Sequence, residues 1–225
     1  MSHPATILTI DVVLLTLLDQ QIHVGLVQRD NPQEPFFQAW TLPGGFVRPE
    51  TDHDAAHTAI RVLQDKAGVQ SPYLEQLATF SGANRDPRGW SASIVYYALV
   101  APHIAPDGDA RLRWEPVDQV ARRTLPFDHS AILHMAVERV RSKTSYSTLP
   151  LHLMPDTFTI SELREVYEQL LGGTLEPRGF IRRMQEMNAL EETGLTRTER
   201  HRPARVYRAR QASGLNMLEA SLLPK

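Results

Sequence analysis

Apolar and polar positions follow two different periods along the chain, and the period of a β-strand dominates its first half. Val, Ile, Leu and Thr crowd residues 7–18, which predicts a buried strand. After a polar turn at 19–21, apolar residues alternate with other residues through 22–29, which predicts a second strand that completes a hairpin. Further strands are expected at 74–80, 93–100 and 111–117.

The period changes to that of a helix after Asp52. Apolar residues then recur at helical spacing as far as Gly68, a natural helix stop. The preceding segment, WTLPGGFV, predicts a strand end followed by a glycine loop. In that loop Gly44 and Gly45 would allow a tight turn and a close approach to a ligand.

A second helix is expected at about 130–141, with Asp128 as its N-cap. Beyond it, prolines at 150 and 155 interrupt the periodic pattern. Because prolines disfavour regular structure, we place a domain boundary there and expect domains at 1–148 and 149–225.

The second domain opens with a predicted helix over 158–171. Thr159 followed by Glu162 is the pattern of a capping box at its start. Another helix is expected from Pro177, because proline favours the first helical position. Two helices joined by a short glycine-containing turn predict a helix-turn-helix. The second helix is expected to carry Phe180, Ile181, Met184 and Met187 on one side.

The segment 193–210, TGLTRTERHRPARVYRAR, predicts a hairpin wing that turns at 201–203, with Leu195 and Val206 facing inward. It sets many arginines against a single acid, Glu199, although the net charge of the chain is −2. Local basicity of this kind is typical of proteins that bind a phosphate backbone. A wing used for protein contacts and a merely solvated hairpin remain alternatives. The residues expected at DNA are Arg178, Arg182 and Arg183 in the helix and Arg197, Arg200, Arg202 and Arg205 in the wing.

Composition narrows the classes of protein. Of the 225 residues, 42% are hydrophobic, which is enough for a core, and no residue is Cys. The absence of Cys excludes disulfides, thiol catalysis and Cys-based zinc sites, and it fits a reducing cytosol. The apolar run 5–18 lacks the basic flank of a signal peptide, and no stretch is long enough to span a membrane. We therefore expect a cytoplasmic protein with no membrane partner.

Polar and aromatic residues gather in the predicted loops of the first domain. The loop 81–91 holds three charged residues, and arginine forks suit phosphates, although an exposed hairpin loop would also carry such charges. An aromatic residue before the glycine loop could stack on a flat ring or simply plug the edge of the sheet. His129 could donate to an anionic ligand at a helix N-terminus or only neighbour the cap. The residues expected at a ligand are Arg29, Phe36, Trp40, Gly44, Gly45, Arg85, Asp86, Arg88, Asp128 and His129.

The segment 40–69 resembles the Nudix box, G-x5-E-x7-R-E-U-x-E-E-x-G-U, where U is aliphatic. The residues that match this pattern are Gly45, Arg61, Leu63, Gly68 and Val69. Thr51 stands where the loop glutamate is expected, and Arg61 arrives two residues late. The helical carboxylates of the box fall at three positions that are occupied here by Val62, Asp65 and Lys66.

These substitutions decide the expected chemistry. Nudix hydrolases gather Mg²⁺ on carboxylates that share one helix face, and Mg²⁺ prefers oxygen ligands. Val62 has no oxygen to offer, and Lys66 puts an ammonium where the metal's charge should be. We therefore expect no metal site, no cofactor and no enzyme activity. The alternative is a hydrolase that uses other ligands, such as Glu50, Asp52 or Asp54.

The order of these features across residues 6–210 resembles the Nudix-related transcriptional regulators of NAD metabolism. The resemblance implies an α/β Nudix-like sandwich with a mixed sheet, followed by a C-terminal winged helix-turn-helix. It also implies a homodimeric repressor of NAD biosynthesis or salvage genes that binds palindromic double-stranded operators and is released by ADP-ribose or a related effector. The rivals are an active pyrophosphohydrolase on ADP-ribose, a regulator that responds to sugars, and a protein-interaction module.

Overall fold

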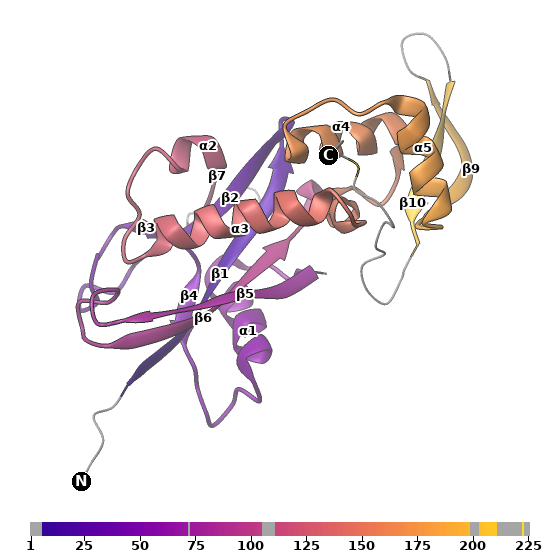
Figure 1. Cartoon of the computed structure of the whole chain (residues 1–225). Coiled ribbons are helices and arrows are strands. Elements are labelled where there is room, and N and C mark those ends of the chain that lie inside the picture. The colour runs from indigo at the N-terminus through magenta and orange to yellow at the C-terminus, as the bar shows by residue number, and fades with distance from the viewer. Residues whose placement is uncertain (1–5, 72, 105–110, 199–202, 211–221, 223–225) are drawn as a thin grey trace. The chain divides into compact units, whose positions relative to one another are not determined.

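Figure 1 shows the computed structural model of the chain, which describes residues 6–71, 73–104, 111–198, 203–210 and 222. The chain forms two compact units that divide between Val137 and Glu138, with Leu17–Gln21 grouped with the second unit. Each unit is described below by itself.

The first unit is built on a mixed sheet, as expected for an α/β sandwich. Its strands run in the order β3-β2-β1-β6-β5, while β4 pairs with β1 and β7 pairs with β2. The central pair, β1 and β6, is parallel, whereas β5, β3, β7 and β4 pair with their neighbours in antiparallel fashion. The strands are β1 (Ile7–Leu18), β2 (Gln21–Gln28), β3 (Trp40–Thr41), β4 (Gly44–Phe46), β5 (Tyr73–Gly82), β6 (Ser91–Leu99) and β7 (Leu112–Pro116).

Strand β1 is buried on both faces, which explains its nearly continuous apolar sequence. On one face, Ile10 and Val12 belong to a core cluster that includes Val62 and Leu63 of helix α1 (Ala55–Ala67). On the other face, Val13 is equally buried. The remaining elements of this part of the chain are η1 (Pro102–Ile104), α2 (Val117–Val120) and α3 (His129–Thr144), whose last residues belong to the second unit.

The glycine segment is a strand and not the tight turn that the sequence led us to expect. Gly44 and Gly45 pair with Asp11 and Ile10 of β1, and neither has a positive φ. A close approach is present, but it is to another strand of the protein, whereas the expected approach was to a ligand. A Cβ on Gly44 would lie 2.3 Å from Asp11 Oδ1. A Cβ on Gly45 would lie 3.0 Å from Val62 Cγ2. These two glycines therefore let β4 lie directly on β1 and α1.

Helix α1 begins and ends where the sequence indicated. The carboxylate of Asp54 accepts a hydrogen bond from the backbone N–H of His57, and Gly68 ends the helix in the left-handed region at φ 65°. Helix α3 starts one residue earlier than expected and continues three residues further, to Thr144.

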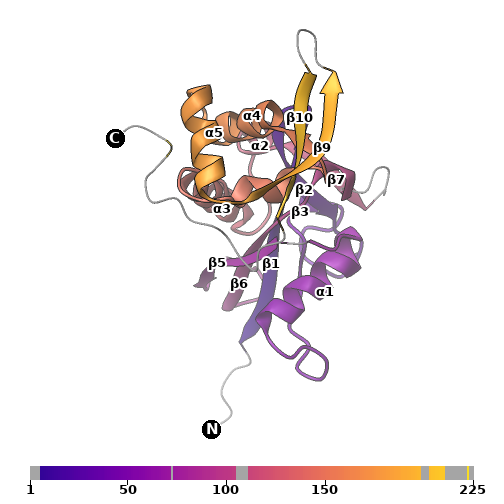
Figure 2. The ribbon, with the colours of Figure 1, turned by 90° about the vertical axis from the view of Figure 1, so that its right-hand side faces the viewer.

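The second unit holds a helix pair followed by a β-hairpin (Figures 1 and 2), which confirms the winged helix-turn-helix. Its three-stranded sheet has the order β8-β10-β9. Tyr167 and Phe180 join the two helices, with ring centroids 5.1 Å apart in an edge-to-face arrangement. The elements are η2 (Leu149–Leu153), β8 (Phe158–Thr159), α4 (Ile160–Leu171), α5 (Pro177–Glu186), β9 (Leu190–Thr198) and β10 (Pro203–Ala209).

Two expectations about apolar positions in this unit are wrong. Ile181 is 38% exposed, so it does not share the buried side of α5 with Phe180 and Met184. Leu195 is 63% exposed on β9, whereas Val206 on β10 is buried as expected. The turn of the hairpin, with Glu199, Arg200, His201 and Arg202, lies outside the described residues. Among the helices that the structure describes, none has the length and apolarity needed to cross a bilayer.

The capping box at α4 provides a test of the winged helix itself. Thr159 Oγ1 accepts from Glu162 N, and Glu162 Oε2 accepts from Thr159 N. Thr159→Ala removes the first bond, and we expect it to lower the free energy of unfolding by about 1 kcal/mol. Ser161→Ala, at an exposed position in the same turn, is the matched control. Urea unfolding followed by circular dichroism measures both, and equal stability of the two variants contradicts the role of the cap.

Candidate functional site

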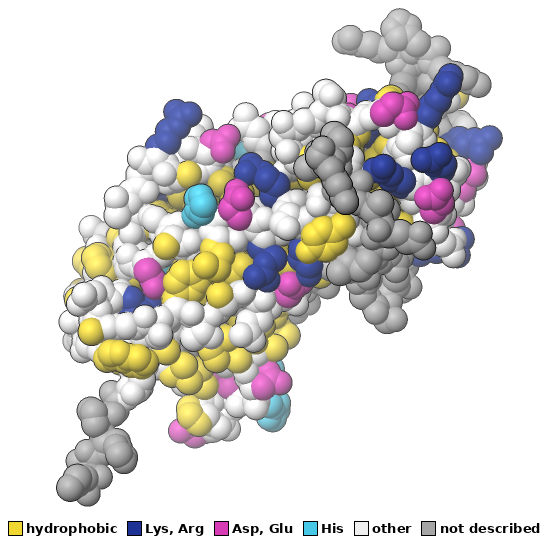
Figure 3. Space-filling model, viewed as in Figure 1, with side chains coloured by type: hydrophobic (Ala, Val, Ile, Leu, Met, Phe, Trp, Pro, Cys, Tyr) yellow, Lys and Arg dark blue, Asp and Glu magenta, His cyan; other side chains and the backbone are white. Residues whose placement is uncertain are grey.

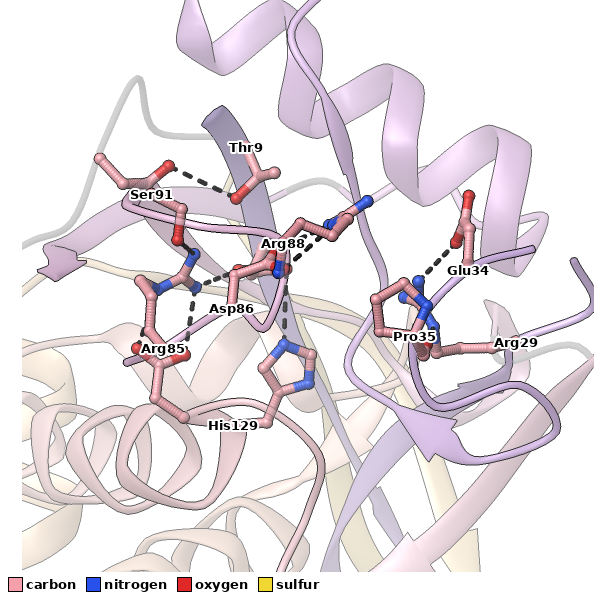
Figure 4. A network of polar contacts seen from close by, with 12 residues as sticks. Thr9, Arg29, Glu34, Pro35, Arg85, Asp86, Arg88, Ser91 and His129 are labelled. Atoms are coloured by element: carbon pink, nitrogen blue, oxygen red, sulfur yellow. Dashed lines mark hydrogen bonds and ion pairs between the residues drawn. The ribbon is translucent and has the colours of Figure 1, made fainter. Parts of the chain in front are cut away.

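A pocket of about 230 Å³ opens in the first unit. It lies between the β1–β4 pair, the end of β2, the face of α1, the loop between β5 and β6, and the start of α3. Its lining is rich in charged side chains of both signs, and Figure 4 shows part of this polar network. The lining residues are Thr9, Asp11, Val27, Gln28, Arg29, Asp30, Glu34, Thr41, Leu42, Gly44, Gly45, Phe46, Arg48, Arg61, Val62, Asp65, Lys66, Arg85, Asp86, Arg88, Phe127 and His129.

Arg85 is the hub of a buried charge cluster on the pocket wall. Its side chain is 6% exposed and donates to Asp128 from Nε at 3.0 Å and from Nη2 at 3.1 Å. It also donates to Asp11 Oδ2 at 3.2 Å and to Ser91 Oγ at 3.2 Å. Burial alone would lower the pKa of Arg85, but these two carboxylates raise it. Four of the five N–H donors of this guanidinium are therefore already in use.

His129 occupies the other side of Asp11. The backbone N–H of Leu42 donates to His129 Nδ1 at 3.1 Å, so Nδ1 acts as an acceptor and the ring proton sits on Nε2. Nε2 lies 3.6 Å from Asp11 Oδ1. Burial would raise the pKa of Asp11, but the histidine and Arg85 hold it below the usual value. Asp11 is thus a buried, charged acceptor at the floor of the pocket.

Arg88 follows Arg85 in the same loop but has a different environment. Its backbone N–H and its Nε donate to Asp86 Oδ1 at 2.9 and 3.0 Å, and its Nη2 donates to Asp86 Oδ2 at 2.7 Å. Burial would raise the pKa of Asp86, but Arg88 lowers it. The guanidinium also lies 5.0 Å from the ring centroid of Phe46 and remains 30% exposed. Arg88 therefore presents an oriented cation to the pocket.

The helix face that would carry a metal site in a hydrolase also lines the pocket. Val62 is buried, and Asp65 lies within 4 Å of two guanidinium groups, Arg48 at 3.8 Å and Arg61 at 3.7 Å. Lys66 is exposed there, and no described residue forms an ion pair with it. Within the described residues, no group of three or more His, Cys, Asp or Glu side chains is arranged to hold a metal ion.

Arg61 stabilises the loop that precedes α1. It donates to Asp52 Oδ1 at 2.7 Å, to Asp52 Oδ2 at 2.6 Å and to the backbone oxygen of Phe46 at 2.9 Å. The same carboxylate accepts from Thr58 Oγ1 and from the backbone N–H of Arg48, and Arg61 holds the pKa of Asp52 well below its usual value. Asp52, one of the alternative metal ligands considered from the sequence, is therefore fully engaged in the loop.

Three residues expected at the ligand do not line the pocket. Phe36 packs edge-to-face on Phe127, with ring centroids 4.7 Å apart. The ring centroid of Trp40 lies 4.2 Å from Cζ of the Arg113 guanidinium. Asp128 instead binds Arg85 through its carboxylate. The other expected residues line the pocket, namely Arg29, Gly44, Gly45, Arg85, Asp86, Arg88 and His129.

The residues of this site that sequence reasoning missed include Asp11, Phe46 and Phe127. Asp11 interrupts the apolar run 5–18, and an acid in the middle of a buried strand is itself a signal of a site. Phe127 lines the pocket at a positive φ of 56°, and Arg29 lies over its ring at 5.1 Å. No local pattern in the sequence points to that backbone conformation.

The expected DNA-binding residues lie in two places, on helix α5 and in the hairpin wing. On α5, Arg178 and Arg182 are exposed, and Arg182 lies 3.7 Å from Glu186, whereas Arg183 is only partly exposed. In the hairpin, Arg197 donates to Glu162 at 2.6 Å and Arg205 lies 3.3 Å from Glu192. Figure 3 shows basic and acidic side chains interspersed where Figure 1 draws α5 and β9.

The wing is thus less one-sided in charge than its sequence suggested, because acids just before it pair with its arginines. Besides Glu192, Glu191 receives two bonds from Arg208, at 3.0 and 2.8 Å. Exposed ion pairs of this kind contribute little to stability. They can therefore exchange for a phosphate partner at low cost.

Comparison with known proteins supports both units. The Nudix domain family matches residues 8–135, and the NrtR DNA-binding winged helix domain matches residues 150–209. The ADP-ribose-responsive transcriptional repressor NtrR of Acinetobacter baylyi is 40% identical over 210 residues, which cover 92% of this chain and 83% of that protein. An ADP-ribose pyrophosphatase of Methanocaldococcus jannaschii is 29% identical over 116 residues, 48% of this chain and 68% of that protein.

Solved structures agree with these matches. The crystal structure of Shewanella oneidensis NrtR complexed with a 27mer DNA has a TM-score of 0.88 at 39% identity, covering 96% of this chain and 99% of that chain. The Nudix domain of the same protein complexed with ADP-ribose has a TM-score of 0.55 at 40% identity, covering 61% and 90%. The chain therefore belongs to the NrtR family, with a Nudix domain followed by a DNA-binding winged helix domain.

Proposed function

We propose that this protein is a transcriptional repressor of NAD biosynthesis or salvage genes, and that ADP-ribose releases it from DNA. In this proposal two chains form a homodimer that binds a palindromic operator, since two-fold proteins read two-fold sites. One observation carries the proposal: a single chain joins a cation-lined Nudix pocket to a winged helix, at 40% identity to an ADP-ribose-responsive repressor over 92% of its length.

The lining of the pocket suits a nucleoside diphosphate sugar. Lys66 and Arg88 supply positive charge for the diphosphate, and the carboxylate of Asp11 can accept hydrogen bonds from ribose hydroxyls. Phe46 and Phe127 place aromatic faces at the pocket for a flat base. Arg85 was expected from the sequence to bind phosphate. In this proposal it instead holds the carboxylates of Asp11 and Asp128 in place.

The same pocket supports sensing without hydrolysis. Mg²⁺ needs several oxygen ligands, but Val62 has none, Asp65 is close to two arginines, and Lys66 would repel the ion. An ammonium at that position can neutralise a diphosphate without activating a water, which is the part of the chemistry that a metal supplies. The effector would then be bound and released intact.

A mobility shift tests the whole proposal. Purified protein is incubated with DNA from upstream of its own gene and from NAD-synthesis genes, with and without ADP-ribose. We expect a retarded complex that ADP-ribose dissolves and that a pentose sugar leaves unchanged. Binding that responds to the sugar alone supports the rival sugar-responsive regulator, and the absence of any specific complex removes the proposal.

The first prediction from this proposal is that ADP-ribose binds without a metal ion and is not hydrolysed. ADP-ribose should bind equally well with Mg²⁺ and with EDTA, and it should be recovered intact after incubation with Mg²⁺ or Mn²⁺. Lys66→Gln should weaken binding by roughly 1.5–3 kcal/mol, because it removes one charged partner of the phosphates. Lys66→Arg, which keeps the charge, is the control. Calorimetry gives the affinities, and turnover of about 1 per second or faster would establish the rival pyrophosphohydrolase.

A second prediction separates the two arginines of the β5–β6 loop. Arg88→Ala should weaken ADP-ribose binding by roughly 1.5–3 kcal/mol and leave effector-free DNA binding intact. Arg85→Ala should instead lower the free energy of unfolding by about 3 kcal/mol, because Asp11 would stay buried without its partner. Arg113→Ala, exposed and outside the pocket, is the control. Loss of affinity without loss of stability in Arg85→Ala would reverse this assignment.

A third prediction divides work between helix and wing on DNA. Arg182→Ala should relax sequence preference, since an arginine in the major groove can fork onto guanine. Arg205→Ala should weaken binding to all sequences alike and reduce the salt slope by about 1, as expected for one lost phosphate contact. Competition between operator and random DNA across a salt series decides it, with Arg123→Ala from the first unit as control. The division is wrong if the wing variant alone alters sequence preference.

A further inference from the structure

Helix α5 presents one exposed face that is not uniformly basic. Arg178, Ile181, Arg182 and Gln185 are all exposed, and their spacing of three and four residues places them on one side of the helix. Phe180 and Met184 are buried on the opposite side. The face that remains available to a partner therefore carries two cations, one apolar side chain and one amide, with the carboxylate of Glu186 at its border, 3.7 Å from Arg182.

The N-terminus of α5 is already occupied by a carboxylate of its own chain. Glu176 Oε1 accepts from the backbone N–H of Arg178 at 2.9 Å, and its Oε2 accepts from Gly179 N at 2.5 Å. These are the donors that would otherwise receive a phosphate at a helix N-terminus. Because Glu176 fills them with negative charge, the helix is better suited to meet DNA with its exposed side than with its end.

Ile181 is an apolar residue at the edge of that side, next to the buried Met184. A single exposed apolar residue is ordinary on a protein surface. This one, however, lies one turn from Arg178 and directly beside Arg182 on a helix of a DNA-binding winged helix domain. In the major groove the apolar group that such a side chain can contact is the methyl group of thymine.

Gln185 completes the set near the C-terminal end of the helix. Its backbone oxygen accepts from Asn188 N at 2.9 Å, but no described residue forms a hydrogen bond with its side-chain amide. In the major groove a glutamine amide can pair with both groups of one adenine. Its nitrogen donates to N7, and its oxygen accepts from the N6 amine.

We propose that Ile181 and Gln185 are specificity-determining residues, with Ile181 contacting a thymine methyl and Gln185 pairing with an adenine in each operator half-site. This inference rests on the proposed function. From Arg178 to Gln185 the helix rises about 10 Å, which spans about three base pairs. Each half-site core should therefore hold A·T pairs read by these two residues beside a G·C pair read by an arginine.

Selection of binding sites from random DNA by the full-length protein tests the inference. Wild type, Ile181→Ala, Gln185→Ala and Gln185→Glu are compared, with Glu165→Ala, exposed on α4, as the matched control. Gln185→Ala should lose preference for adenine at one position of each half-site by about tenfold. Gln185→Glu should shift that position toward cytosine, whose N4 amine can donate to a carboxylate.

Base analogues then isolate each contact in the selected site. Replacing the thymine by deoxyuridine removes only the methyl group and should weaken wild-type binding about fourfold, as expected for one apolar carbon. Ile181→Ala should bind both forms equally. Replacing the adenine by 7-deazaadenine should weaken wild type but not Gln185→Ala.

The outcomes separate this inference from the proposed function. If wild type selects no sequence, the proposed function fails. If wild type selects a motif that both Ile181→Ala and Gln185→Ala also select, with the same responses to the analogues, the inference alone fails. If wild type selects a motif, and each variant changes the base preference at one position of it, both the proposed function and the inference are supported.

Discussion

The ion pair between Arg85 and Asp11, 3.2 Å apart, is the contact on which the pocket of the Nudix domain depends. Asp11 lies in the middle of an apolar strand, where an unpaired carboxylate would be very unfavourable. Two separate elements supply its polar partners, since Arg85 comes from the β5–β6 loop and His129 from the start of α3. A third element, β4, can lie against it because Gly44 has no side chain to clash with its carboxylate. One buried charge therefore ties the β5–β6 loop and the start of α3 to the central strand of the pocket.

The winged helix uses ion pairs in the opposite way. Its arginines are exposed and matched by glutamates on neighbouring positions, as Arg208 is with Glu191. Such pairs hold side chains loosely, because water screens them and both side chains lose rotamer freedom on pairing. A phosphate can replace the glutamate with little loss. The buried cluster thus fixes the geometry of the pocket, whereas the exposed pairs leave the arginines available to bind phosphate.

The order of the longer strands and helices could be predicted from sequence patterns, since β1, β2, α1, α4 and α5 all follow clear apolar or capping signals, whereas the short strands β4 and β8 could not. The pocket could be predicted in part, because loop arginines and a helix-start histidine carry recognisable chemistry. What failed depends on tertiary neighbours. Gly44 was expected in a turn, but its side-chain hydrogen is required by Asp11 across a strand pair. Likewise, Leu195 and Ile181 have apolar side chains that local pattern assigns inward, and only the packed unit shows them exposed.

In the proposed function, the substitution of a metal-binding carboxylate by Lys66 also defines what the protein can report. A hydrolase lowers the concentration of the ligand it binds, so its occupancy cannot follow that concentration at equilibrium. In the proposed function the ligand is bound without being hydrolysed, so its occupancy can reach equilibrium and can be linked to DNA binding. If ADP-ribose weakens DNA binding by a given factor, then DNA must weaken ADP-ribose binding by the same factor. The apparent affinity for ADP-ribose therefore depends on how much operator is bound, and the operator-bound form should respond only at higher effector concentration than the free protein.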